Sequence, residues 1–329
     1  RNAPLARGHF FDTVFFGGGT PTLLSPDQIG DLLETAKGLY TVSRDAEITC
    51  EANPATADEN GLRALRQTGV NRLSMGVQSF RNGELYGLSR AHTAEEAEAF
   101  FYCARDAGFT NVNMDLMYGI PGQTVDSFEK TLTKAFSLSP EHISVYGLIL
   151  EEGTPFYAEK DRLSLPEEDE ELKMYRLLTA SMREKGYLHY EISNYARDGF
   201  LCRHNLHYWH GESYLGFGDA AYSCFNGKRY GNSRDFSHYL QNPTGIRGEE
   251  ETVAGEDERE EYIMLRLRLS EGIGLDEYAA RFGERIETVY ADVMEKYTVL
   301  GMAKTECGRF FLTEEGMEVS NTVITDFFS

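Results

Sequence analysis

Five short apolar runs alternate with segments of helical periodicity in the first half of the chain. The runs cover residues 13–16, 46–51, 72–77, 112–117 and 142–146, and each predicts a buried strand. Apolar positions recur with a helical period over residues 26–40, 57–68, the stretch up to 108, and 125–137. Ser25 and Pro26 supply an N-cap and a first-turn proline to the first helix. This alternation is typical of a parallel sheet or barrel.

The second half of the chain has a different pattern. Residues 167–185 predict an amphipathic helix, and residues 187–236, rich in Tyr, His, Asn and Gly, predict irregular structure with short strands. The polar, acidic residues 244–255 predict an exposed linker. Residues 256–329 predict three helices, a hairpin of 303–304 with 310–313, and a final helix, the order of a winged-helix module. We therefore expect domains at residues 1–150, 151–250 and 251–329.

Composition and charge narrow the class of protein. The 329 residues include 32 Lys+Arg and 53 Asp+Glu, a net charge of −21. Phosphate binding needs a basic face, so nucleic acid is not expected as a partner and the winged-helix-like segment is expected to pack rather than bind DNA. No apolar stretch approaches the ~18 residues of a membrane span, although peripheral membrane contact stays open. Five scattered cysteines favour a reducing cytoplasm over a disulfide framework.

In parallel folds the active site lies at the carboxyl ends of the strands. That edge would hold Gly17–Thr20, Glu51, Asn53, Gln78, Asp115 and Tyr118. Three glycines directly after a strand let the backbone approach a ligand, and their amides can bind a carboxylate or phosphate. A tight strand-to-helix turn is the alternative. The loop is neither a Walker loop nor a dinucleotide fingerprint, because the lysine and the spacing are absent.

Charged side chains near the same edge suggest a polar ligand. Glu51 is positioned to accept hydrogen bonds from an ammonium group, or else to cap the next helix. Gln78 and Asp115 hold equivalent positions on later strands, and an aspartate suits a ribose diol because it accepts from two hydroxyls. Arg90 either meets a ligand carboxylate bidentately or is an ordinary surface arginine.

Three of the eight histidines and the single tryptophan lie within residues 204–210. If the segment is helical, His204, His207 and His210 lie near one another. Zinc would need more ligands than the nearby Cys202 supplies. Haem iron takes one axial His or Cys, and an aromatic-rich pocket suits a porphyrin face. The alternative is an aromatic loop whose histidines are simply hydrogen-bonded.

In order and spacing these motifs resemble the radical S-adenosylmethionine (SAM) superfamily, in the branch of the oxygen-independent coproporphyrinogen III oxidases (HemN-type) and the HemW-type haem chaperones. The matching segments are FFGGGTPT (15–22), EANP (51–54), SMGVQSF (74–80), DLMYGIPGQT (115–124) and ISVY (143–146). HNLHYW (204–209) is similar to the His-Asn-x-x-Tyr-Trp signature of the HemW-type branch, which favours the chaperone over the oxidase.

The resemblance implies an α/β fold: a partial parallel (β/α)6 barrel, lacking its first strand here, with a winged-helix-like α+β C-terminal domain. The barrel would cradle SAM beside a 4Fe–4S cluster. The residues implied for SAM are Gly18, Gly19 and Thr20 at the methionine part, Glu51 at the amino group, Arg90 at the carboxylate, and Gln78 and Asp115 at the ribose.

The activity implied is to bind haem, with His204 and His207 as candidate haem residues, and to pass it to acceptor haem proteins. The alternative is oxidative decarboxylation of coproporphyrinogen III propionates by a 5′-deoxyadenosyl radical. One departure is large, because the Cys-x-x-x-Cys-x-x-Cys motif that holds the family's cluster is absent. The strand expected to carry it would precede Arg1, so we expect either a fragment whose N-terminal segment is missing or a natural protein that has lost its cluster. As written, this chain is not expected to run radical chemistry.

Overall fold

The computed structural model describes residues 2–245 and 247–328. Its internal contacts divide the chain into two compact units. The first, called the sheet unit below, comprises Gly8–His189 and Ser193–Cys202; the second, called the C-terminal unit, comprises Arg1–Arg7, Tyr190–Ile192 and Arg203–Ser329. The three-part division expected from the sequence stays a prediction.

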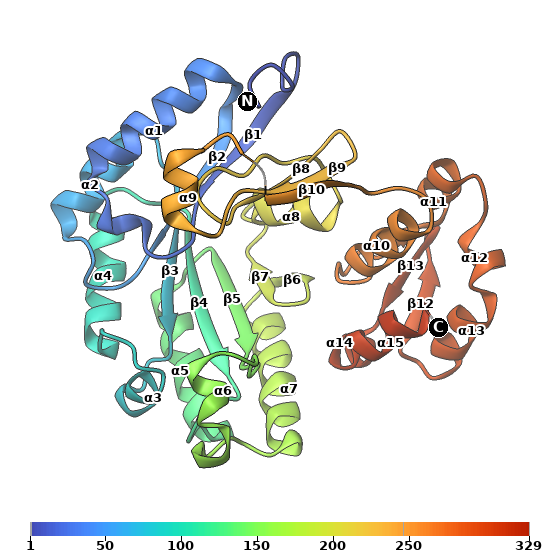
Figure 1. The fold of residues 1–329 in the computed structure, drawn as a ribbon. Helices are drawn as coiled ribbons and strands as arrows, with labels where there is room; N and C mark the ends of the chain where they lie inside the picture. The colour runs from blue at the N-terminus through green and yellow to red at the C-terminus, as the bar shows by residue number, and fades with distance from the viewer. Residues whose placement is uncertain (1, 246, 329) are drawn as a thin grey trace. The chain divides into compact units, whose positions relative to one another are not determined.

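A curled half-barrel sheet forms the framework of the sheet unit (Figure 1). Strands β1 (Phe10–Phe16), β2 (Thr41–Ala52), β3 (Arg72–Gln78), β4 (Val112–Tyr118) and β5 (His142–Gly147) pair in chain order, each parallel to the next. Strand β7 (Asn194–Ala196) adds antiparallel to β5, and β6 (Leu188–Glu191) ends the sheet order. The five predicted strands and the parallel α/β class are confirmed.

The helices predicted between the strands are also present. They are α1 (Pro26–Leu39), α2 (Glu59–Gln67), α3 (Asn82–Gly87), α4 (Ala94–Asp106), α5 (Val125–Leu138) and α7 (Glu168–Glu184), with a short α6 (Pro155–Ala158). Ser25 begins α1 with a capping box, in which its hydroxyl accepts from Gln28 N at 3.3 Å and its own N–H donates to Gln28 Oε1 at 2.8 Å. The expected N-cap is therefore confirmed.

Alternation along the strands separates two faces of the sheet. Apolar side chains of one face, such as Cys50, Met75 and Met114, join a core with apolar residues of the helices. The opposite face is polar and holds Glu51 on β2, Ser74 and Gln78 on β3, Asn113 and Asp115 on β4, and His142 and Ser144 on β5. The hollow side of the half-barrel is thus lined with hydrogen-bonding groups.

The long segment of the C-terminal unit begins with α8 (Arg203–Trp209). A small sheet of β8 (Tyr222–Phe225), β9 (Lys228–Gly231) and β10 (Arg247–Thr252) comes next, and α9 (Phe236–Gln241) lies between β9 and β10 in the chain. The predicted linker over 244–255 is wrong where β10 pairs antiparallel with β9. The physical reason is that the pairing is non-local, because the partner strand β9 lies about twenty residues earlier in the chain. Two ion pairs cross the strand pair: Lys228 Nζ lies 3.0 Å from Glu250 Oε2, and Arg229 NH1 lies 3.7 Å from Glu251 Oε2.

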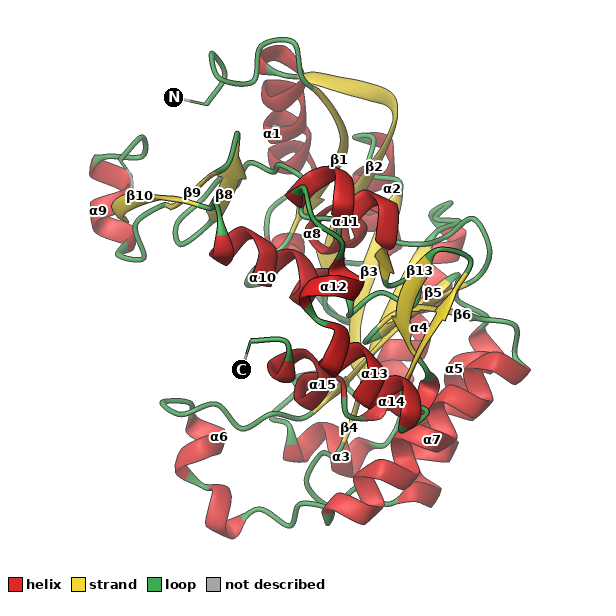
Figure 2. Ribbon diagram, turned by 90° about the vertical axis from the view of Figure 1, so that its right-hand side faces the viewer, coloured by secondary structure: helices red, strands yellow, loops and turns green. Residues whose placement is uncertain are grey.

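The end of the chain forms a second small core. Helices α10 (Glu256–Arg266), α11 (Leu275–Phe282), α12 (Ile286–Val289) and α13 (Ala291–Val299) precede the hairpin of β12 (Ala303–Glu306) and β13 (Arg309–Leu312). Strand β11 (Ile273–Gly274) pairs with β13, and α14 (Glu314–Glu318) and α15 (Ser320–Asp326) follow (Figure 2). The hairpin is confirmed; four helices precede it rather than three, and two follow it rather than one.

Within the part of the chain that the structure describes, no helix has the length and apolar character needed to cross a membrane.

Candidate functional site

The glycine-rich loop after β1 faces open space. Gly18 and Gly19 have φ angles of 76° and 62°, which favour glycine, and a Cβ built on either meets no atom within 4 Å. The Gly18 N–H donates to Glu51 Oε2 at 3.1 Å. The loop therefore presents its backbone outward, as a ligand-binding turn requires.

Glu51 belongs to this loop and not to the next helix. The N-cap of α2 is Asp58, which accepts from Gly61 N at 2.8 Å. Burial raises the pKa of the Glu51 carboxyl, the Gly18 N–H lowers it, and the nearby charge of Asp115 raises it further. Two carboxylates that repel each other at one site favour a cationic group between or beside them.

Arg90 is a half-buried bridge rather than a surface arginine. Its NH2 donates to Asn53 Oδ1 at 2.7 Å and to the carbonyl of Gly76 at 3.1 Å. Asn53 Nδ2 in turn donates to Thr20 Oγ1 at 3.0 Å. Burial lowers the pKa of Arg90, whereas the charge of Asp115 raises it. Asn53 therefore links the glycine-rich loop to Arg90. This role could not be predicted from the sequence, which indicates only that Asn53 follows the second strand.

Gly76 is a residue that sequence reasoning missed. A Cβ built there would lie 2.7 Å from Asn53 Oδ1, 3.0 Å from Arg90 NH2 and 3.2 Å from Gln78 Nε2. Gln78 itself has a φ of 66°, and the β3–β4 register shifts between Gly76 and Gln78. Strained backbone and bulges of this kind cluster at ligand sites, where they redirect side chains.

Asp115 completes the site on β4. Its Oδ1 accepts from Asn113 Nδ2 at 2.8 Å. Burial raises the pKa of the carboxyl, and Asn113, Ser144, Arg72 and Arg90 each lower it. Gly18 and Glu51, Thr20 and Arg90 through Asn53, and Asp115 with both Glu51 and Arg90 are thus joined by hydrogen bonds or by electrostatic interaction. Gln78 lies beside Gly76, with its Nε2 3.2 Å from a Cβ built there. Their individual roles stay predictions.

The chemistry of this site fits a zwitterion with hydroxyl groups. The carboxylates of Glu51 and Asp115 suit an ammonium group and a diol, and Arg90 suits a carboxylate. The open space over Gly18 and Gly19 leaves room for a ligand to approach the backbone. SAM carries each of these groups, so the residues present fit it.

The histidine segment is helical up to Trp209. His204 and His207 lie on α8, where His204 Nε2 is 3.1 Å from Tyr208 Oη and His207 Nδ1 pairs with Glu212. His210 follows the helix, with its Nε2 3.1 Å from Glu271 Oε1. These histidines therefore have hydrogen-bond partners within the C-terminal unit.

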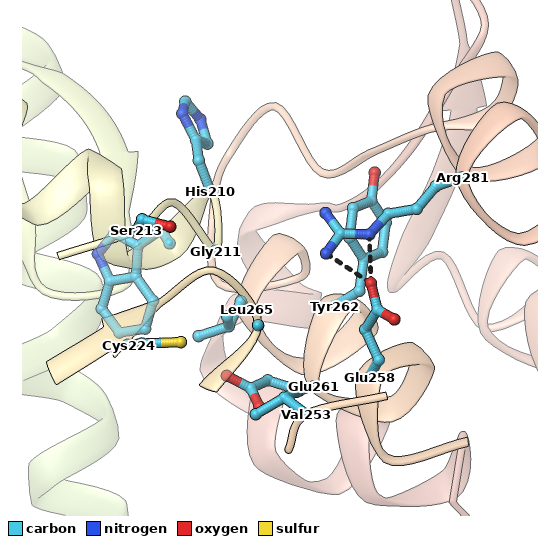
Figure 3. Close-up of a pocket in the computed structure, with 12 residues that line it drawn as sticks. His210, Gly211, Ser213, Cys224, Val253, Glu258, Glu261, Tyr262, Leu265 and Arg281 are labelled. Carbon is cyan, nitrogen blue, oxygen red and sulfur yellow. Dashed lines mark hydrogen bonds and ion pairs between the residues drawn. The ribbon is translucent and has the colours of Figure 1, made fainter. Parts of the chain in front are cut away.

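A cavity of about 230 Å³ lies beside this segment (Figure 3). Its lining includes Trp209, His210 and Cys224. Glu258 and Arg281 form a hydrogen-bonded pair on the wall opposite Cys224. His204 and His207 are not among the lining residues. The volume is below the roughly 300–1,000 Å³ of pockets for drug-sized ligands, so a porphyrin does not fit inside it.

The described residues do not fit an iron–sulfur cluster. They contain no group of three or more His, Cys, Asp or Glu side chains placed to hold a metal ion. The cysteines are Cys50, Cys103, Cys202, Cys224 and Cys307, and none of them forms a disulfide. Burial, with the charge of Glu51, raises the pKa of the Cys50 thiol to about 12. We derive no step through a cluster.

Comparison with known proteins agrees with this fold. The model of the radical SAM superfamily matches residues 4–135, and the model of the HemN C-terminal domain matches residues 253–319. Coproporphyrinogen III oxidase (HemN) from Escherichia coli, described as a radical SAM enzyme, has a similar structure with a TM-score of 0.84, 23% sequence identity, and coverage of 99% of this chain and 79% of that one. At that identity the likeness shows the fold: a radical SAM barrel with a HemN-type C-terminal domain.

Curated relatives are more similar in sequence. "Heme chaperone HemW" from Bacillus subtilis is 36% identical over 322 residues, 96% of this chain and 85% of the relative. The protein of the same name from Escherichia coli is 34% identical over 334 residues, 98% of this chain and 85% of the relative. The chain therefore belongs to the HemW family of the radical SAM superfamily.

Proposed function

We propose that this protein is a haem chaperone, which binds haem and passes it to acceptor haem proteins. The observation that carries the proposal is the match, over nearly the whole chain, to relatives named heme chaperones. His204 and His207 on α8 are the proposed haem residues, since imidazole is a common axial ligand of haem iron. Five cysteines that form no disulfide support a cytoplasmic location.

A hemin titration tests the haem proposal. Wild-type protein should show a saturable Soret band near a stoichiometric ratio, and the double variant His204→Ala/His207→Ala should weaken or shift it. His238→Ala, on the exposed α9 of the same unit, is the matched control and should behave as wild type. If the wild-type protein shows no saturable hemin binding, the proposal is wrong.

We propose in addition that the site at the carboxyl ends of β1 to β4 binds SAM. The groups that support this are the open loop of Gly18 and Gly19, the carboxylates of Glu51 and Asp115, and the guanidinium of Arg90. Thr20 belongs with the loop, and Gln78 is placed with Asp115 at the ribose. Because the described residues supply no ligand set for a cluster, the proposal is one of binding only.

Calorimetric titration with SAM tests this site. Asp115→Ala should weaken SAM binding by about 1–3 kcal/mol, because the ligand hydroxyls lose a buried hydrogen-bonding partner. Asp126→Ala is a matched control, since Asp126 is an exposed aspartate in an ion pair with Lys130 on α5. Equal SAM affinity in the Asp115→Ala variant and the wild type would refute the assignment.

A further inference from the structure

Asn113 occupies the centre of a buried network beneath the proposed SAM site. Its side chain is 2% exposed and lies on β4 between Ser74 of β3 and His142 of β5 in the sheet register. Asn113 Nδ2 donates to Ser74 Oγ at 2.7 Å and to Asp115 Oδ1 at 2.8 Å. Asn113 Oδ1 lies 2.6 Å from His142 Nδ1 and accepts from Ser144 Oγ at 3.1 Å.

The chemistry of the partners dictates which way the amide points. An ionised carboxylate only accepts hydrogen bonds, so the NH2 group of Asn113 must face Asp115. The amide oxygen must then face β5, where it needs donors from Ser144 and His142. His142 consequently carries its proton on Nδ1. With two donated and two accepted bonds, the hydrogen-bonding capacity of the amide is fully used.

His142 is suited to this part because it is held neutral. It is fully buried, and burial together with the nearby charge of Arg72 keeps its pKa well below the ordinary histidine value. A neutral imidazole has one donor nitrogen, and the amide oxygen of Asn113 selects which one it is. The tautomer of His142 and the orientation of Asn113 are therefore coupled.

We propose that Asn113 is a positioning residue that holds the Asp115 carboxylate in place for a ligand hydroxyl, with His142 and Ser144 holding Asn113. This inference rests on the proposed binding of SAM at Asp115. It goes beyond that proposal because it states which residues, Asn113 with His142 and Ser144, hold the carboxylate in place. Asn113 lies too deep to be a ligand contact, since its side chain is used entirely by protein partners.

The network also affects the charge of Asp115. Three charged groups act on this carboxyl: Glu51 from β2, Arg72 from β3, and Arg90 from the segment after α3. His142 from β5, on the far side of Asn113, is neutral. Asn113 and Ser144 lower the Asp115 pKa by hydrogen bonding, against the upward effect of burial. Removal of the amide therefore favours the protonated carboxyl, which binds a diol less well.

The test is SAM affinity measured from pH 5.5 to 8.5 in wild type and Asn113→Leu. Asn113→Leu should weaken SAM binding by about tenfold at pH 7 and move the pH at which affinity is lost upward. Gln123→Leu is the matched control: its amide is equally buried, but it donates to Glu84 and to the Met117 carbonyl instead of Asp115. A merely structural loss should weaken both variants without a change in pH profile.

A second variant and a second readout keep the inference independent of SAM. If Asn113→Leu does not fold, Ser74→Ala removes one hydrogen-bond partner of the Asn113 amide without touching Asp115 and should show the same pH shift at smaller size. Nitrogen-15 NMR of the ligand-free protein should show His142 protonated on Nδ1, and this tautomer preference should be lost in Asn113→Leu.

The outcomes separate the two proposals. If the wild type shows the His142 tautomer but binds no SAM, the SAM proposal fails and the assigned network remains without a ligand role. If SAM binds to the wild type and Asn113→Leu keeps both its affinity and its pH profile, the positioning role of Asn113 is overturned. A proton on Nε2 of His142 in the wild type also overturns it.

Discussion

At the residue scale, the proposed SAM site depends on close packing around an absent side chain. Gly76 has no Cβ, and that space is taken by Asn53 and Arg90. Asn53 then reaches Thr20, so one glycine on β3 allows the glycine-rich loop and Arg90 to be joined. The motif around Gln78 was identifiable from the sequence, whereas the reason for its glycine required the packing.

Replacement of Gly76 by alanine should disrupt this arrangement. The added methyl group would lie 2.7 Å from Asn53 Oδ1, so the Asn53–Arg90 hydrogen bond must shift or break. We expect a loss of about 1–3 kcal/mol in the free energy of unfolding and weaker SAM binding. Gly38→Ala is the control: it lies in α1 with no atom within 4 Å of a built Cβ, so it should stabilise the protein by about 0.5–1 kcal/mol in urea denaturation. If the two substitutions changed the free energy of unfolding in the same direction relative to wild type, the proposed role of Gly76 would be contradicted.

The buried His142 predicts a pH dependence of stability. Its pKa in the folded chain is well below the ordinary value, so below about pH 6.5 the unfolded chain binds a proton that the folded chain does not. The free energy of unfolding therefore has its full value above that pH. It falls as the pH drops from there toward the folded pKa, by up to about 1.4 kcal/mol per pH unit.

Urea denaturation at several pH values measures this effect. Between pH 6.5 and pH 5 the free energy of unfolding should fall less steeply in His142→Gln than in the wild type, while at pH 8 the two slopes should coincide. Parallel curves throughout would mean that the burial of His142 has no effect on protonation.

At the element scale, strands and helices with regular periodicity were predictable and charge-paired strands were not. The parallel strands of the sheet unit show apolar runs that local spacing reveals. Strand β10 has no such run; it pairs antiparallel with β9, and its Glu250 and Glu251 form ion pairs with Lys228 and Arg229 of that strand. Its pairing depends on residues about twenty positions away, so its own sequence resembles an exposed linker.

The turn of the C-terminal hairpin yields a prediction at the same scale. Between β12 and β13, Cys307 and Gly308 both have positive φ angles, of 51° and 75°. Two-residue turns of this kind favour Asn-Gly, and residues other than Gly, Asn or Asp are strained there. Cys307→Asn should raise the free energy of unfolding by about 1 kcal/mol, because Cys307 is exposed and loses no packing.

A substitution with the opposite expected effect, at the neighbouring glycine of the turn, serves as the control. Gly308→Ala should lower the unfolding free energy by a similar amount, since alanine at this φ is strained while nothing lies within 4 Å of its Cβ. Thermal or urea denaturation measures both. A destabilised Cys307→Asn variant would show that the turn does not control this hairpin.

At the scale of the whole molecule, charge is the dominant property. The net charge of −21 is carried by 53 acidic against 32 basic residues, and self-repulsion of a compact chain opposes folding. The HemN-type C-terminal domain shares this acidic character, as the first turns of α10 and α11 illustrate. Its winged-helix-like order therefore remains best interpreted as a packing element.

Salt should consequently stabilise the protein. Raising NaCl from about 0.01 M to 0.1 M shortens the screening length from about 30 Å to about 10 Å, so the repulsion among carboxylates weakens. The urea midpoint at pH 7.5 should increase with salt, and the increase should shrink as the pH approaches the isoelectric point. A midpoint that falls with added salt would show that the surface ion pairs outweigh the net repulsion.

Taken by itself, the sequence determined the order of the elements and the edge where the proposed ligand-binding residues gather. Apolar periodicity is a local property, and parallel strands place their carboxyl ends together whatever the details of packing. The order of the motifs was also enough to identify the superfamily. For the same reason Glu51, Gln78 and Asp115 could be named as candidate site residues without coordinates.

Only the tertiary structure decided how those residues are supported. Asn113 and His142 are separated by 29 positions, and the contact between them follows from the β4–β5 register rather than from any motif. The space at Gly76 depends in the same way on three segments that meet there. Register and packing join residues far apart in sequence, so their consequences appear only when the chain is folded.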